Sequence, residues 1–230
     1  NAQYLIKKEM EDSVCVAILK QIAAIQNPLE RNRIVSLSKA VLSQTSRYYD
    51  NVVYVIKSIT EIKAPERENV IKHAKKLIRY EMENNDIIPI IEGLSMVPEE
   101  ERSSLVQMIN SMIAHQKKPN FHFTGDNWGG VTKSIAQLPV DQRAPLVELI
   151  NLMIKKHQEA NENENDCSRG WHSTIEALIA LKVEERKDVV HHAMSFIDSV
   201  CDYTTSTTIK AIGEIKTEER GEVLNFTRLL

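Results

Sequence analysis

Six arginines recur along the chain, and a guanidinium is the side chain best shaped to pair with a carboxylate through two parallel hydrogen bonds. Neighbouring members of the set are 34 to 43 residues apart. They are Arg31, Arg67, Arg102, Arg143, Arg186 and Arg220. Because a residue required in every copy of a pattern serves the copies themselves, we expect a structural role. In that role each arginine pairs with an acidic residue of its own or the neighbouring copy.

Six aspartates recur alongside these arginines. Each stands shortly before an apolar run, where a short carboxylate usually accepts hydrogen bonds from the free N–H groups of a helix start. They are Asp12, Asp50, Asp86, Asp126, Asp166 and Asp202. We expect these aspartates to be helix N-caps, and they are one candidate set of partners for the arginines.

The residues around each arginine have the periodicity of a helix. After the arginine, apolar residues fall three, four, seven, ten and eleven positions on, as in Val70, Ile71, Ala74, Leu77 and Ile78. These positions share one face at about 3.6 residues per turn, so they predict an amphipathic helix. Similar spacing before the arginine predicts a first helix, so each copy is a helical hairpin.

These hairpins define the expected organisation of the chain. Seven Gly and seven Pro in 230 residues leave little material for the turns of an all-β fold, which favours an all-α one. We predict a single domain over residues 1–230 with about six antiparallel helix-turn-helix copies. Their approximate ranges are 12–44, 50–80, 86–115, 126–157, 166–200 and 202–230. The sequence starts at Asn1 and stops at Leu230 without a helix cap, so we expect a piece of a longer protein.

Hairpins of this length, a proline-prone inner turn (APER, VPEEER, LPVDQR) and an arginine early in the second helix resemble the HEAT and armadillo-like α-solenoids. The tetratricopeptide Trp, Gly and Tyr pattern and the ankyrin TPLH string are absent from the sequence. The resemblance implies a right-handed α-solenoid in which the second helices line the concave wall. A partner would then bind along that wall.

The side chains expected on this wall lie five and nine positions after the arginine. They are Lys72, Lys76, Gln107, Ser111, Glu148, Leu152, His191 and Ser195. Their chemistry changes from copy to copy, as a recognition surface on a shared scaffold requires. Lys72 and Lys76, with Lys75 and Arg79, make the second copy locally basic, which suits an acidic peptide or RNA, although a solvated helix face is the plain alternative.

The loop over residues 115–130 is a second candidate contact, because long insertions between repeats often carry binding residues. It combines Phe121 and Phe123 with Trp128 and two lysines. The alternative is that these aromatic side chains fill a gap between copies. The glycines of TGDNWGG lack the spacing of a phosphate-binding loop and follow no expected strand.

No local motif indicates catalysis, a cofactor or a metal. The sequence has no HExxH, nucleotide fingerprint or kinase-like string, and the adjacent His191 and His192 point about 100° apart on a helix. We therefore expect a non-enzymatic scaffold that binds another protein, with RNA binding by helical repeats as the alternative. The net charge of −3 disfavours nucleic acid. No apolar run is long enough for a membrane span, so we expect no membrane partner and a location in the cytoplasm, its own or a host's.

Overall fold

A computed structural model of the chain describes residues 2–7, 10–45, 48–78, 82, 84–116, 127–160, 171–194 and 203–227. Within these ranges the chain forms α-helices and two short 3-10 helices, and it forms no strand. The all-α prediction is therefore confirmed.

The chain divides into two compact units. The first holds residues 1–109 and 127–137, and the second holds residues 110–126 and 138–230. The first unit contains η1 (Ala2–Tyr4), α1 (Asp12–Ala24), α2 (Pro28–Leu42), α3 (Tyr48–Glu61), η2 (Ala64–Glu66), α4 (Arg67–Leu77), α5 (Asn84–Met96), the larger part of α6 (Glu99–Gln116) and α7 (Trp128–Ala136). The second contains α8 (Val140–Ala160), α9 (Trp171–Ala180), α10 (Val183–Ala193), α11 (Tyr203–Glu214) and α12 (Thr217–Thr227). Whether the chain is one continuous domain stays a prediction.

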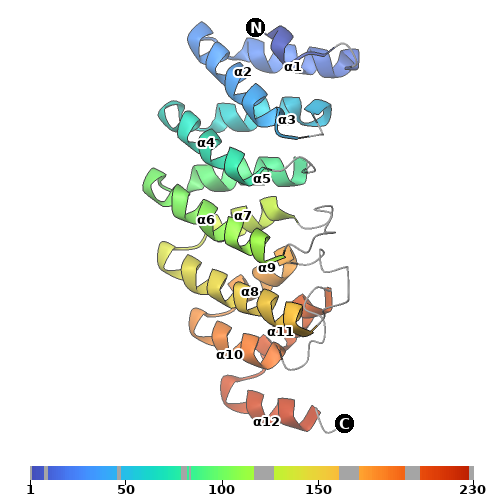
Figure 1. Cartoon of the computed structure of the whole chain (residues 1–230), viewed down its shortest axis with the longest axis vertical. Helices are drawn as coiled ribbons and strands as arrows, with labels where there is room; N and C mark the ends of the chain where they lie inside the picture. The colour runs from blue at the N-terminus through green and yellow to red at the C-terminus, as the bar shows by residue number, and fades with distance from the viewer. Residues whose placement is uncertain are drawn as a thin grey trace. The chain divides into compact units, whose positions relative to one another are not determined.

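The helices of each unit contact one another in a regular order (Figure 1). In the first unit α1 contacts α3, α3 contacts α5 and α5 contacts α7, while α2 contacts α4 in a second layer. In the second unit α9 contacts α11 and α8 contacts α10. Alternate helices are therefore neighbours within each unit.

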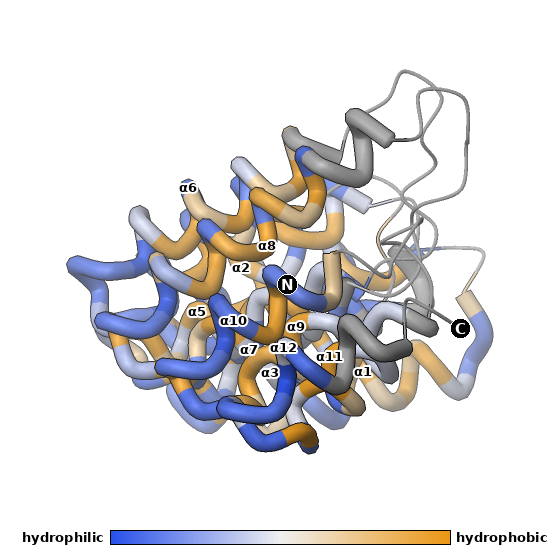
Figure 2. Tube along the Cα trace, turned by 90° about the horizontal axis from the view of Figure 1, so that it is seen from below, coloured by the Kyte–Doolittle hydropathy of each residue, from blue (hydrophilic) through white to orange (hydrophobic). Residues whose placement is uncertain are grey.

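The apolar stripes predicted from the sequence form the core between these layers. Along α4, Val70, Ile71, Ala74, Leu77 and Ile78 are each at most 4 % exposed. The equivalent apolar residues of α6 and α8 are buried as well. Hydrophobic and hydrophilic residues alternate along the helices in Figure 2, as burial of one face requires.

The predicted N-cap aspartates are wrong where the structure describes them. Asp12 is the first residue of α1, whose N-cap is Glu11. Asp50 and Asp86 are each the third residue of a helix, α3 and α5. These helices begin before the apolar run does, because polar residues extend the first turn without needing a buried face. A carboxylate there still faces the positive end of the helix dipole.

The remaining caps of the prediction fall elsewhere. Asp126, Asp166 and Asp202 lie outside the described residues. Two helix starts are capped by an asparagine side chain: Asn27 Oδ1 accepts from Leu29 N at 2.9 Å at the start of α2, and Asn127 Oδ1 accepts from Gly130 N at 2.7 Å at the start of α7. An Asn side chain offers a capping oxygen as Asp does. Asp86 Oδ1 accepts from Gly129 N at 3.2 Å, so this carboxylate contacts the start of α7.

A glycine sets the distance between α5 and α7. A Cβ atom on Gly93 would lie 3.0 Å from Lys133 Cα and 3.2 Å from Lys133 N, both of them backbone atoms that cannot rotate away. Lys133 Nζ also donates to Glu92 Oε2 at 2.6 Å across the same contact. The absence of a side chain at Gly93 therefore permits this packing.

We expect Gly93→Val to lower the free energy of unfolding by about 1–3 kcal/mol, because it overpacks the contact between α5 and α7. Gly221→Ala is the matched opposite: a Cβ there meets nothing within 4 Å, so the better helix former should stabilise α12 by about 0.5–1 kcal/mol. Urea unfolding followed by circular dichroism measures both. An unchanged midpoint for Gly93→Val would show that α5 and α7 do not pack this closely.

Candidate functional site

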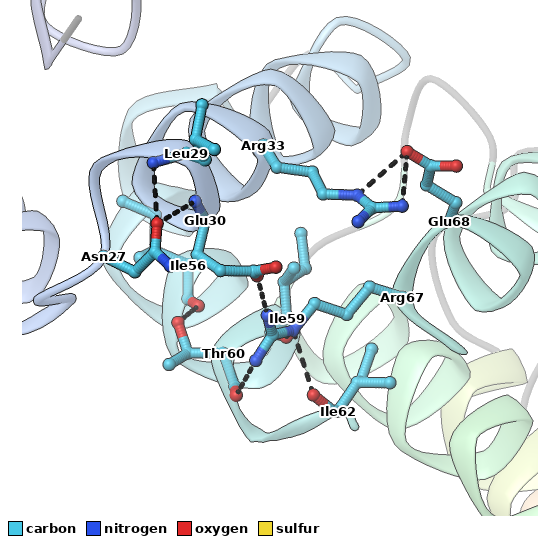
Figure 3. Close-up of polar contacts among 10 residues, drawn as sticks. All are labelled: Asn27, Leu29, Glu30, Arg33, Ile56, Ile59, Thr60, Ile62, Arg67 and Glu68. Carbon is cyan, nitrogen blue, oxygen red and sulfur yellow. Dashed lines mark hydrogen bonds and ion pairs between the residues drawn. The ribbon is translucent and has the colours of Figure 1, made fainter. Parts of the chain in front are cut away.

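Arg67 shows what the recurring arginine does. Its Nε donates to Ile59 O at 3.0 Å and to Ile62 O at 2.9 Å, and its Nη2 donates to Thr60 O at 3.0 Å. The last carbonyls of a helix have no partner within the helix, so this guanidinium caps the C-terminal end of α3. Its Nη1 meanwhile pairs with Glu30 on α2 (Figure 3).

The capping contact recurs in the other copies of the sequence pattern. Nε donates to the carbonyl oxygen eight residues earlier, five residues earlier or both. The contacts are Arg102 to Leu94 at 2.9 Å, Arg143 to Leu138 at 3.0 Å, Arg186 to Leu178 at 2.9 Å, and Arg220 to Ile212 at 3.1 Å and Ile215 at 2.9 Å. Arg31 donates to Ile25, six residues earlier, since its turn is one residue longer.

The rest of the guanidinium binds the preceding copy. Its partner is the residue immediately before that copy's own arginine: Arg67 pairs with Glu30, Arg102 with Glu66, Arg186 with Gln142 and Arg220 with Glu185. The residue two positions after that arginine adds a second contact, from Asn69 to Arg102 and from Asp188 to Arg220. The predicted pairing with the neighbouring copy is thus present, but the capping aspartates are not the partners.

Sequence inspection could have found these partners. An acid or amide stands immediately before the arginine in every copy, at Glu30, Glu66, Glu101, Gln142, Glu185 and Glu219. Four of these arginines are buried, with Arg102 0 % and Arg220 1 % exposed, whereas Arg31 and Arg67 are half-buried. These guanidinium groups direct their hydrogen bonds to the turns and to the preceding copies, so a structural role stays our interpretation of their recurrence.

Burial and pairing act in opposite directions on these charges. The hydrogen bond from Arg220 lowers the pKa of Glu185 below its ordinary value, against the raising effect of burial. For Arg220, burial lowers the pKa, but the hydrogen bonds and charges of Glu185 and Asp188 together outweigh it and the net pKa is raised. Burial lowers the pKa of Arg186, whose neighbour Gln142 is a neutral amide and offers no compensating charge.

The residues predicted to face a partner are mostly exposed. In the first unit Lys72, Lys76 and Gln107 are exposed; in the second unit Glu148, Leu152 and His191 are exposed and Ser111 is half-buried. Leu152 is an apolar side chain left 45 % exposed. The predicted contacts Phe121, Phe123 and Ser195 lie outside the described residues.

Trp128 bears on the hypothesis that the loop over residues 115–130 contacts a partner. Trp128 is the first residue of α7 and is 2 % exposed, so this aromatic side chain belongs to the core of the first unit. Gly129 and Gly130 are buried residues of the same helix. The end of this segment is therefore structural.

The exposed face of α2 carries a hollow that the sequence reading missed. It has a volume of about 310 Å³ and is lined by Tyr4, Asn32, Val35, Ser36 and Lys39. Lys39 Nζ lies 5.1 Å from the centroid of the Tyr4 ring, within the range of a cation–π contact. Lys39 stands eight positions after Arg31, which is a solvent-facing position of the pattern, but nothing in the sequence shows that η1 comes to the same place.

No protein-family model, curated protein or solved structure matches the chain. Within the described ranges, no helix is both long enough and apolar enough to cross a lipid bilayer. The same ranges hold no cluster of three His, Cys, Asp or Glu side chains placed to share a metal ion. The fold and the arginine contacts define an all-α protein in which, within each unit, buried arginines join consecutive helices.

We expect Arg102→Met to lower the free energy of unfolding by about 3–5 kcal/mol, because it leaves the Leu94 carbonyl and Glu66 without their donor. Arg102→Lys keeps the charge but not the planar fork, so a loss of about 1–3 kcal/mol is expected. Arg33→Lys is the control: the Arg33–Glu68 pair at 2.9 Å joins α2 and α4 on the surface, so its loss should be below about 1 kcal/mol. Equal losses at Arg33 and Arg102 in urea unfolding would refute the structural assignment.

Acid should weaken the Arg220 contact in a defined direction. Since the folded pKa of Glu185 is depressed, its contribution is fully present above the ordinary glutamate pKa of about 4.3 and is lost as the pH falls through the lower, folded value. We expect Glu185→Gln to reduce stability above about pH 5 and to differ little from the parent protein near pH 3. Thermal unfolding from pH 7 to pH 3 measures this, with the exposed Glu222→Gln as control. A stability difference independent of pH would contradict the pairing.

Proposed function

We propose that this protein is a non-enzymatic scaffold that binds another protein through the exposed faces of its second helices, α2, α4, α6, α8 and α10. The observation that carries the proposal is the contrast between two sets of positions. After the first five arginines, where burial is described, the positions three, four and seven on are buried. The position five on is exposed, at Ser36, Lys72, Gln107, Glu148 and His191. The buried set is nearly uniform in chemistry, and the exposed set differs in every copy.

The proposed architecture is a right-handed α-solenoid of about six helix-turn-helix copies. In support of it, alternate helices are neighbours within each unit, and each described arginine uses one part of its guanidinium for its own turn. The same arginines of α4 and α6, and those of α10 and α12, use the other part for the preceding copy. Stacking of this kind leaves a long open surface, which suits binding of an extended partner.

Binding without catalysis is the better proposal for this surface. The recurring arginines and the carboxylates that pair with them are engaged in packing between helices. The exposed positions carry Ser, Lys, Gln, Glu and His one at a time on separate helices. An open surface of this kind excludes little water, which acid–base and oxyanion chemistry need.

The test is affinity capture from cell lysate, with and without nuclease. We expect the intact chain to retain a protein whether or not nuclease is present, and the double variant Lys72→Glu, Glu148→Lys to lose it, because both exposed charges are reversed. The control, Lys20→Glu with Glu214→Lys, makes the same charge reversals at exposed positions of the first helices α1 and α11.

Two results would overturn the proposal. Retention by the Lys72, Glu148 variant equal to that of the control would move the contact away from the second helices. Recovery of RNA, with the signal abolished by nuclease, would establish the alternative of nucleic-acid binding, which the lysines of α4 favour. Circular dichroism on each variant confirms that helicity is unchanged.

A further inference from the structure

We propose that α2, α4 and η1 form a docking site for a short acidic segment of a partner protein, with one side chain of that segment in the hollow between Tyr4 and α2. This inference rests on the proposed function and names the chemistry of the partner. Four observations carry it: the charge balance of the two helices, the spacing of their lysines, the lining of the hollow, and the point at which the positive charge stops.

The first observation is that the carboxylates of this surface pair with arginines, so its net positive charge comes from lysines. Over residues 28–42 and 64–77, seven Lys and Arg stand against three Glu. All three of these carboxylates are bound by arginine: Glu30 by Arg67, Glu66 by Arg102 and Glu68 by Arg33. No carboxylate of these helices is left to neutralise Lys39, Lys72 and Lys75. A chain with a formal net charge of −3 therefore presents a positive surface here.

The second observation is the spacing of the lysines. The Arg33–Glu68 bridge fixes the register between α2 and α4, which are in contact. Lys39 lies six residues beyond Arg33 and Lys72 four beyond Glu68, so at 1.5 Å per residue they stand roughly 9 Å and 6 Å past the bridge. Neighbouring helix axes lie about 8–10 Å apart. An extended peptide rises about 3.3 Å per residue, so about three residues cover that distance. Because side chains of an extended peptide alternate between its two faces, acidic residues two or four positions apart lie on one face, and the flexible lysine side chains can reach both.

The third observation is the hollow beside Lys39. Its volume of about 310 Å³ is at the small end of ligand pockets, which suits one side chain and not a folded domain. Val35 and the Tyr4 ring contribute apolar lining, Asn32 also lines the hollow, and Ser36 offers a hydroxyl for hydrogen bonds. An aromatic or aliphatic side chain flanked by carboxylates would fit this combination.

The fourth observation decides between a peptide and a nucleic acid. The exposed position of α6 equivalent to Lys72 is Gln107, and α6 begins with three glutamates. Among the described residues the positive surface of α2 and α4 is therefore not continued on α6, whereas a phosphate backbone is held by charges repeated along its length. One face of the Tyr4 ring is also taken by Lys39, which leaves less of it for stacking on bases.

The experiment is selection of a phage-displayed library of random 12-residue peptides on the full chain, followed by fluorescence anisotropy with the best peptide synthesised and labelled. We expect selected sequences rich in Asp and Glu around one aromatic or aliphatic residue. Lys39→Glu and Lys72→Glu should each weaken the peptide at least tenfold, and Lys20→Glu, an equal charge change on α1, should alter its affinity less than twofold.

Several outcomes would overturn this inference. Selected peptides without an acidic excess, no selected peptide at all, or equal binding by Lys39→Glu and Lys20→Glu would each remove the site. So would tighter binding of a labelled 12-nucleotide uridine RNA, or of vesicles containing phosphatidylserine, than of the peptide. If the lysate capture still depends on Lys72 and Glu148 in any of these cases, the scaffold function stands and only the acidic site fails.

Discussion

The structure depends on one side chain that recurs at the described turns, a guanidinium that binds its own turn. In four of the copies it binds the preceding copy as well. Its Nε satisfies carbonyl oxygens at the end of the first helix, and its remaining nitrogens reach a residue of the preceding copy, as Arg102 does with Leu94 and Glu66. Lysine cannot replace it, because a single ammonium lacks the planar fork that spans both partners. The arginines of α4, α6, α10 and α12 therefore hold both the turn of their own hairpin and the register with the copy before it.

This use of arginine divides the charges of the molecule into two groups. The arginines and their glutamate partners are engaged within the packing, where they are partly or fully buried. The hydrogen bond from Arg220 also lowers the pKa of Glu185. Lysines are left on the exposed faces, since a flexible ammonium keeps its hydration there at little cost. The local positive surface on α2 and α4 is thus a consequence of how the interior is neutralised, not of a general basic excess.

The parts predicted correctly depend on residues close together in sequence. The burial of Val70 and Ile71, the exposure of Lys72 and the structural role of Arg102 follow from spacing within a few helical turns. The N-cap predictions at the described aspartates were wrong, because capping also depends on residues that are far away in the sequence. Asp86 has the residue type and position of a cap, yet it binds Gly129 on another helix, and Asn127 caps α7. Whether a short polar side chain caps its own helix depends on what packs beside it.

The sequence by itself determined the all-α class, the amphipathic faces and the set of recurring arginines, because all of these follow from the spacing of residues along the sequence. The tertiary structure decided which acid each arginine binds and where a hollow forms. Arg67 and Glu30 are 37 residues apart, and Tyr4 meets Lys39 from a segment outside the repeated pattern. Pairing over such separations is set by how helices pack against one another, and no local pattern encodes it.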